Sequence, residues 1–162
     1  MKKIEIPASL YIFENTSELP EAVQGLMQRA AEARENAYAP YSNFQVGAAL
    51  LLDNGKIIKG NNQENAAYPS GLCAERTALY YAGAKYPDAA IVAICVTASG
   101  KHKSSEIPIP PCGACRQAIA EYEVKQKSPV AIYFMGKQGK VMKSDSLENL
   151  LPVLFTQNLL GK

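Results

Sequence analysis

Ile91–Ala98, with the sequence IVAICVTA, is the stretch that decides the fold. It is an unbroken apolar run rich in β-branched residues, which is typical of a strand buried at the centre of a sheet with both faces covered. We therefore predict a central strand here, with Cys95 as a core residue. The segments before and after this run determine the class of fold.

Two further strands are predicted before the central one, from Phe44 to Leu52 and from Lys56 to Asn61. They flank Asn54-Gly55, which is a strong hairpin turn signal. A helix is predicted from near Ser17, because apolar residues recur at helical spacing as far as Ala37. Its apolar positions are Ala22, Val23, Leu26, Met27, Ala30, Ala33 and Ala37.

Alternating helices and strands are predicted along the rest of the chain. We expect helices at about Cys73–Lys85 and Cys112–Glu123, strands at Pro129–Met135 and Lys140–Ser144, loops at Asn62–Gly71 and Lys101–Pro111, and a mainly helical segment at Leu147–Leu160. Strands that alternate with helices indicate an α/β sandwich with a mixed sheet.

The overall composition excludes several classes of protein. The 162 residues suit one compact domain, and 48% hydrophobic with 20% charged residues is a globular composition. The 17 basic and 15 acidic residues are spread along the chain, so we expect neither a nucleic-acid nor a membrane partner. We find no apolar run long enough for a signal peptide at residues 1–7, and no stretch that could span a bilayer.

Two short motifs carry the chemistry, Cys73-Ala74-Glu75 and Pro111-Cys112-Gly113-Ala114-Cys115. They supply three thiols and one carboxylate. A catalytic zinc takes three protein ligands and keeps its fourth position open, whereas a structural zinc closes with four. Three of the four cysteines lie in these motifs, which favours a metal site in a reducing, cytoplasmic compartment over a disulfide framework.

The spacing of the motif residues fits two helix starts. Cys112 and Cys115, three residues apart, share a helix face, whereas Cys73 and Glu75 do not, so the metal must lie beyond the end of the helix. The positive ends of two helices then face the thiolates and favour their ionised form. Arg76, three residues after Cys73, can offset the net negative charge of a zinc with three thiolates; otherwise it is a solvated surface arginine.

Each motif alone has a simpler interpretation. Cys112-Gly113-Ala114-Cys115 could be a redox dithiol, and Cys73 could be a small buried hydrophobic residue. Together, a ligand-x-Glu element and a Pro-Cys-x-x-Cys element match the pattern of zinc-dependent nucleobase deaminases. His102, the only histidine, lies in a polar loop and is expected to face solvent.

Four blocks in order along residues 34–155 make the chain resemble the small, homotetrameric type of cytidine deaminase. These blocks are Tyr38-Ala39-Pro40-Tyr41-Ser42-Asn43-Phe44-Gln45-Val46-Gly47-Ala48-Ala49, Gly60-Asn61-Asn62-Gln63-Glu64-Asn65-Ala66-Ala67-Tyr68-Pro69, Cys73-Ala74-Glu75-Arg76-Thr77-Ala78 and Pro111-Cys112-Gly113-Ala114-Cys115-Arg116-Gln117. The chain departs from the family at Gln45 and Asn61, where proline and cysteine are frequent, and in a longer loop around residues 101–105.

The resemblance implies a fold and a reaction. The fold would be a three-layer α/β/α sandwich around a mixed, mostly five-stranded sheet, in one catalytic domain of residues 1–162 with an N-terminal extension of residues 1–16. The reaction would be the hydrolytic deamination of cytidine and 2′-deoxycytidine to uridine and 2′-deoxyuridine, with release of ammonia. One Zn²⁺ per subunit, held by Cys73, Cys112 and Cys115, would lower the pKa of a water that attacks C4, and Glu75 would shuttle the protons.

The resemblance also implies substrate-binding roles for Phe44, Asn62, Glu64, Ala66, Tyr68, Ala74 and Phe155. Asn62 and Glu64 would bind the ribose 3′-hydroxyl, which needs both a donor and an acceptor. Phe44 would pack on the pyrimidine, and the backbone at Ala74 would contact the base. Tyr68 and Phe155 would reach a neighbouring subunit's site. Without the resemblance, Asn62 and Glu64 read as a polar surface loop and Phe44 as a strand-core residue.

Two rival functions stay open at this point. One is another zinc deaminase, acting on blasticidin S, a nucleotide or a nucleic acid; an anionic Glu64 at the sugar would repel a phosphate there. The other is a non-catalytic zinc or thiol-redox module. The resemblance also implies a homotetramer. From the residues alone, an assembly is indicated because a short C-terminal stretch carries many large apolar side chains, and the alternative is that these side chains pack in the core of a monomer. They are Leu150, Leu151, Val153, Leu154, Phe155, Leu159 and Leu160.

Overall fold

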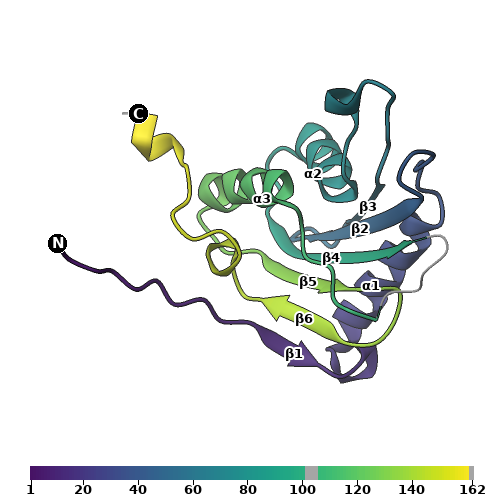
Figure 1. Ribbon diagram of the computed structural model, residues 1–162, viewed down its shortest axis with the longest axis horizontal. Coiled ribbons are helices and arrows are strands. Elements are labelled where there is room, and N and C mark those ends of the chain that lie inside the picture. Colours follow the sequence, from purple (N-terminus) through teal and green to yellow (C-terminus); the bar gives the residue numbers. More distant parts are fainter. Residues whose placement is uncertain (101–105, 161–162) are drawn as a thin grey trace.

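The computed structural model describes residues 1–100 and 106–160, which form a mixed sheet with helices on both faces (Figure 1). Six strands lie in the order β1-β6-β5-β4-β2-β3, and β4 runs parallel to β5 while the other neighbours are antiparallel. Their bounds are β1 Tyr11–Phe13, β2 Phe44–Leu52, β3 Ile57–Asn61, β4 Ile91–Gly100, β5 Ala131–Met135 and β6 Val141–Ser144. The α/β prediction is confirmed, with six strands instead of five.

The sixth strand comes from the segment that was expected to be an extension. β1 is only three residues long, and it pairs with β6 so that Ile12 lies opposite Met142. Its side chains are mostly exposed, as expected for an edge strand that lacks a helix above it. A short and solvent-facing edge strand leaves little hydrophobic pattern in the sequence, which explains why five strands were expected.

Three helices complete the three layers. α1 (Glu21–Arg34) covers one face of the sheet, while α2 (Ala74–Lys85) and α3 (Gly113–Gln126) lie together on the other (Figure 1). Central strand β4 serves both cores: Ile94 belongs to the cluster beneath α2 and α3, and the buried Cys95 belongs to the cluster beneath α1. Two covered faces account for the unbroken apolar run of this strand, and they confirm Cys95 as a core residue.

Two glycines let helices lie directly against the sheet. A Cβ added at Gly47 of β2 would meet the Ala30 carbonyl oxygen of α1 at 2.0 Å. On the other face, a Cβ at Gly60 of β3 would meet the Ala74 carbonyl oxygen of α2 at 2.5 Å. Only glycine permits these approaches, and the second one fixes the start of α2, where Cys73 and Glu75 lie.

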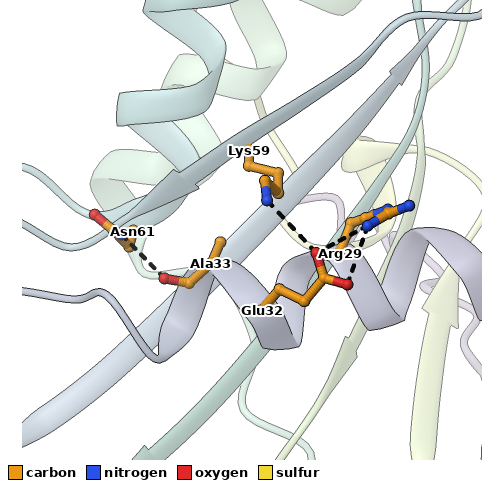
Figure 2. Close-up of polar contacts among 5 residues, drawn as sticks. All are labelled: Arg29, Glu32, Ala33, Lys59 and Asn61. Carbon is orange, nitrogen blue, oxygen red and sulfur yellow. Dashed lines mark hydrogen bonds and ion pairs between the residues drawn. The ribbon is translucent and has the colours of Figure 1, made fainter.

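Polar contacts join α1 to edge strand β3 (Figure 2). The Glu32 carboxylate accepts hydrogen bonds from Arg29 at 3.0 Å and, more weakly, from Lys59 at 3.5 Å. At the end of β3, Asn61 Nδ2 donates to the Ala33 carbonyl at 3.0 Å. Exposed ion pairs stabilise little, so the Asn61 bond is the main contribution of these side-chain contacts, and it adds to the backbone pairing of Asn61 with Gly47 of β2.

Two helix predictions need correction. The first helix does not run from Ser17 to Ala37: the 3₁₀ helix η1 (Thr16–Glu18) precedes α1, since Pro20 at the N-cap lacks an N–H and begins a new helix. The segment 147–160 is not mainly helical. It contains only the 3₁₀ helices η3 (Leu147–Asn149) and η4 (Gln157–Leu160), because Pro152 disfavours the helical conformation in the residue before it.

Some sequence predictions fall outside the described ranges. His102 and the loop residues 101–105 lie there. Within residues 1–100 and 106–160, the helices are too short or too polar to cross a membrane.

Candidate active site

The three motif cysteines converge at the first turns of two helices. Cys73 is the N-cap of α2, Cys112 is the N-cap of α3, and Cys115 lies in the first turn of α3. The Sγ atom of Cys112 is 3.7 Å from that of Cys73 and 3.6 Å from that of Cys115, and all three lie within 4.8 Å of one another. Thiolates bound at about 2.3 Å to a tetrahedral zinc lie about 3.8 Å apart. The donor set and its spacing therefore fit zinc with one open position.

Arg76 places a positive charge beside the Cys73 thiol. Arg76 Nη2 lies 3.7 Å from the Cys73 Sγ atom. A hydrogen bond from the Cys115 thiol, together with Arg76, lowers the pKa of Cys73 to about 5. Arg76 Nε is buried and has no hydrogen-bond partner within the described part of the chain. The thiol is thus the polar group that Arg76 faces, an arrangement suited to the expected charge compensation, which stays a prediction.

Glu75 is the buried acid of the site. Its side chain lies in the first turn of α2 with 4% of its surface exposed. Burial, reinforced by the negative charge of Cys73, raises the pKa of Glu75 to about 7. A carboxyl group with a pKa near neutrality can both accept and release a proton, which is what general acid–base catalysis requires.

A cavity of about 780 Å³ opens in front of these groups. Eight of the predicted site residues line it: Phe44, Asn62, Glu64, Tyr68, Cys73, Glu75, Arg76 and Cys112. Cys115 is fully buried behind Cys112. We call the wall formed by Cys73, Glu75 and Cys112, together with Cys115 buried behind it, the thiol end, and the wall formed by residues 38–44 and 62–65 the loop end.

Besides Cys115, three predicted residues do not line this cavity. Ala66 is exposed, Ala74 is completely buried under β3, and Phe155 is 58% exposed near α3. The Phe155 carbonyl accepts a hydrogen bond from Gln117 Nε2 at 2.9 Å, so its position is tied to the helix that starts at Cys112. Within one chain, the structure therefore brings together the metal-ligand and proton-transfer groups but not every expected substrate contact.

The loop end is held together by Glu64. Its carboxylate oxygen Oε2 accepts the backbone N–H groups of Tyr41 at 2.9 Å and Ser42 at 3.2 Å, and Oε1 accepts the Ser42 hydroxyl. These bonds, with that of the Ser42 hydroxyl first, lower the pKa of Glu64, so the carboxylate stays charged at neutral pH. Backbone bonds of Tyr38 to Asn62 and Glu64 join the same two segments.

Asn62 fastens the loop end to the sheet. Its Oδ1 accepts from the Val46 N–H at 2.8 Å, and its Nδ2 donates to the Phe44 carbonyl at 2.9 Å. Both partners belong to β2, so Asn62 fixes the strand that carries the Phe44 ring beside the cavity. One acceptor site of Oδ1 and one hydrogen of Nδ2 remain for a ligand.

Sequence reasoning missed Tyr41 and Ser42 as site residues. Both stand inside a block used for the resemblance, yet their partner Glu64 is 22 residues further along the chain from Ser42. The ring of Tyr41 also meets that of Tyr68 edge to face, with centroids 6.2 Å apart. The sequence signal that was available is the residue type of Asn43, because asparagine adopts the left-handed conformation more readily than most residues. In the structure Asn43 has a φ of 52° and makes a tight turn just before β2.

The chain is similar to known proteins. Residues 20–131 match the family model of the cytidine and deoxycytidylate deaminase zinc-binding region. A cytidine deaminase of Halalkalibacterium halodurans is 45% identical over 135 residues, which cover 82% of this chain and 93% of that protein. The chain belongs to the cytidine deaminase family.

Other cytidine deaminases agree in sequence and in fold. The enzyme of Sporosarcina psychrophila is 39% identical over 139 residues, covering 83% of this chain and 92% of that protein. The crystal structure of cytidine deaminase from Burkholderia pseudomallei superposes with a TM-score of 0.70 at 41% identity, covering 85% of this chain and all of that one. The resemblance and the zinc cofactor predicted from the sequence are confirmed, with Cys73, Cys112 and Cys115 as the cluster able to hold the ion.

Proposed function

We propose that this protein is a zinc-dependent cytidine deaminase, which converts cytidine and 2′-deoxycytidine to uridine and 2′-deoxyuridine and releases ammonia. The observation that carries the proposal is the convergence of three thiols and one buried carboxyl group at one end of a single cavity, with Cys73, Glu75 and Cys112 in its wall and Cys115 directly behind them. A redox dithiol needs only Cys112 and Cys115, and it gives no role to a buried Glu75 beside them.

Cys73, Cys112 and Cys115 would hold the zinc, which would make a water molecule acidic enough to attack at neutral pH. Glu75 accepts a proton from the water whose oxygen bonds to C4, and it delivers this proton to N3 of the cytosine. It then takes the proton of the new hydroxyl group on C4 and gives it to the amino group, so that the C4–N bond breaks, ammonia leaves and C4 keeps a carbonyl oxygen. Burial among apolar groups holds the pKa of Glu75 near 7, where both transfers are accessible.

The remaining cavity residues bind the nucleoside. Phe44 packs on the pyrimidine, and Asn62 and Glu64 bind the ribose hydroxyl through the donor and acceptor sites that they retain. Tyr68, which lines the cavity, completes the contacts at the exposed rim. Ala66 and Ala74 do not line the cavity of this chain, so the contacts expected of them stay predictions. A lining cation, Arg76, is engaged with the thiol of Cys73 instead of being free for a phosphate. Because Arg76 is engaged and the Glu64 carboxylate is negatively charged, a phosphate group on the sugar would be repelled, which favours nucleosides over nucleotides.

The assay that tests this function measures ammonia release from cytidine, cytosine, deoxycytidine monophosphate and blasticidin S by the zinc-loaded protein. We expect cytidine to be turned over and the other three to be poor substrates. Preference for the nucleotide or for blasticidin S would assign the protein to another zinc deaminase. Stoichiometric zinc without turnover of any substrate would indicate a non-catalytic module.

We also propose that the working form is a cytoplasmic homotetramer of single-domain chains. Reduced thiols are needed to hold the metal, which a cytoplasmic location supplies. Val153, Phe155, Leu159 and Leu160 are between 58% and 84% exposed in the single chain, and such clusters mark interfaces. Light scattering tests the assembly: a fully active monomer would contradict it.

A further inference from the structure

The Ser42 hydroxyl links the two substrate-facing groups of the loop end. It donates to Oε1 of Glu64 and accepts the backbone N–H of Phe44 at 3.0 Å. Asn43, between Ser42 and Phe44, has a φ of 52°, which folds the chain so that a serine hydroxyl can reach the N–H two residues ahead. A single hydroxyl group thus joins the carboxylate of one segment to the first residue of β2.

The number of acceptor sites on Glu64 shows what Ser42 controls. A carboxylate offers about four acceptor sites, two on each oxygen. Both sites of Oε2 are taken by the N–H groups of Tyr41 and Ser42, and one site of Oε1 is taken by the Ser42 hydroxyl. Within the described residues, this leaves one acceptor site, on Oε1, for a ligand.

The bond from Ser42 also fixes the plane of the carboxylate. Bonds to Oε2 alone would leave Oε1 free to swing about the axis of those bonds, because the terminal torsion of a glutamate is broad. Among the described residues, the Ser42 hydroxyl is the only side-chain donor to Oε1, so it decides where the open acceptor site points. Glu64 lines the cavity, and a fixed acceptor there is preorganised for a ligand hydroxyl.

We propose that Ser42 is a positioning residue, whose hydroxyl aims the last acceptor site of Glu64 at a sugar hydroxyl. This inference rests on the proposed nucleoside deaminase function. It predicts that Ser42 acts on the sugar and hardly at all on the chemistry at the base. Its loss should therefore change substrate affinity selectively.

The test compares two ligands that differ in the sugar. Steady-state kinetics give KM and kcat for cytidine and the inhibition constant for 2′,3′-dideoxycytidine, which lacks the hydroxyl that Glu64 would accept. For Ser42→Ala we expect a KM for cytidine about tenfold higher, from the lost hydrogen bond. We expect kcat and the inhibition constant for the dideoxynucleoside to change less than about twofold. Ser42→Thr, which keeps the hydroxyl, should restore most of the affinity.

Ser146 supplies a matched control away from the cavity. Its hydroxyl also bridges a carboxylate, Glu123 at 3.1 Å, and a backbone N–H, that of Glu148 at 3.2 Å. Ser146→Ala should lower the melting temperature and leave the ratio of the two affinities unchanged. Equal weakening of both ligands in Ser42→Ala would reduce Ser42 to a structural role and overturn the inference.

A second readout does not depend on catalysis. The Glu64 carboxyl group can be titrated by carbon NMR, and the Ser42 hydroxyl bond is the largest cause that lowers its pKa. In Ser42→Ala this pKa should rise toward its usual value, while in Ser42→Thr it should stay low. An unchanged pKa in Ser42→Ala overturns the inference even if the protein deaminates nothing. Lack of turnover in the parent, with the expected pKa change, would contradict only the proposed reaction.

Discussion

The thiol end and the loop end of the cavity are stabilised by different means. At the thiol end, Cys73 and Cys112 stand at the N-caps of two helices, and few direct bonds join these helix starts apart from contacts among the thiols. At the loop end, the carboxylate of Glu64 and the amide of Asn62 join three segments through several hydrogen bonds. A bound ion would therefore add to the cohesion of the thiol end, whereas the loop end supplies its own hydrogen bonds.

This difference separates the roles of the two ends. A metal that ties two helix starts together contributes its binding free energy to folding as well as to catalysis. A network of neutral and charged hydrogen bonds contributes about 1 kcal/mol per bond, but it fixes geometry. Substitutions at the thiol end should therefore abolish the reaction, whereas substitutions at the loop end should weaken binding.

The largest effect is expected from removing a ligand. Cys112→Ala should lose zinc and all measurable activity, and it should melt at a lower temperature, because two thiols hold zinc far more weakly than three. Mass spectrometry after dialysis measures the metal. The control is Cys95→Ala, in which a buried thiol beneath α1 is removed at a cost of about 1 kcal/mol while zinc is retained. Stoichiometric zinc in Cys112→Ala would show that the ligand set is wrong.

Next in size is the loss of proton transfer. Glu75→Gln is nearly isosteric, and the amide cannot carry protons between the water, N3 and the leaving amino group. We expect full zinc content with activity lowered about 10²–10⁴-fold. The variant separates zinc binding from proton transfer at the thiol end, because the zinc content should stay full while turnover falls. Near-normal turnover in the zinc-loaded variant would remove Glu75 from its role.

The thiol end could be predicted from the sequence because its information is local. Spacing within each motif predicts which thiols lie at a helix start, and the match of the two motifs together to zinc-dependent deaminases predicts that Cys73 meets Cys112 and Cys115. The loop end could not be predicted in the same way. The contact of Ser42 with Glu64 depends on the fold that places two distant loops together, and no residue type marks it. Similarly, β1 depends on pairing with β6 at the edge of the sheet. The tail after Leu150 is irregular because Pro152 overrides its apolar pattern.

Substitution of two adjacent asparagines, Asn62 and Asn61, measures how much the loop end contributes to stability and to substrate binding. Asn62→Ala leaves the Val46 N–H and the Phe44 carbonyl unpaired, which should cost about 1–3 kcal/mol of stability and raise KM for cytidine about tenfold. Asn61→Ala removes the bond to Ala33 shown in Figure 2, outside the cavity, so it should lower stability without changing KM. Chemical unfolding and steady-state kinetics of both variants supply the comparison. Equal KM values would exclude Asn62 from the site.

The smallest effect is expected from Phe155, which belongs to neither end of its own chain's cavity. Its ring is 58% exposed, and Gln117 holds its carbonyl beside α3. If this ring completes a neighbouring subunit's cavity, Phe155→Ala should raise KM about three- to tenfold through lost apolar contact. It should leave zinc content unchanged.

Mixing experiments then show whose cavity the ring serves. Glu75→Gln chains are inactive but carry an intact Phe155, and Phe155→Ala chains carry an intact Glu75. Co-assembled chains should therefore contain some sites with both groups, and their KM should fall toward that of the parent. If the ring packs only within its own chain, mixing cannot rebuild such a site. A KM that stays at the Phe155→Ala value in mixed assemblies would restrict the cavity to the thiol end and the loop end of a single chain.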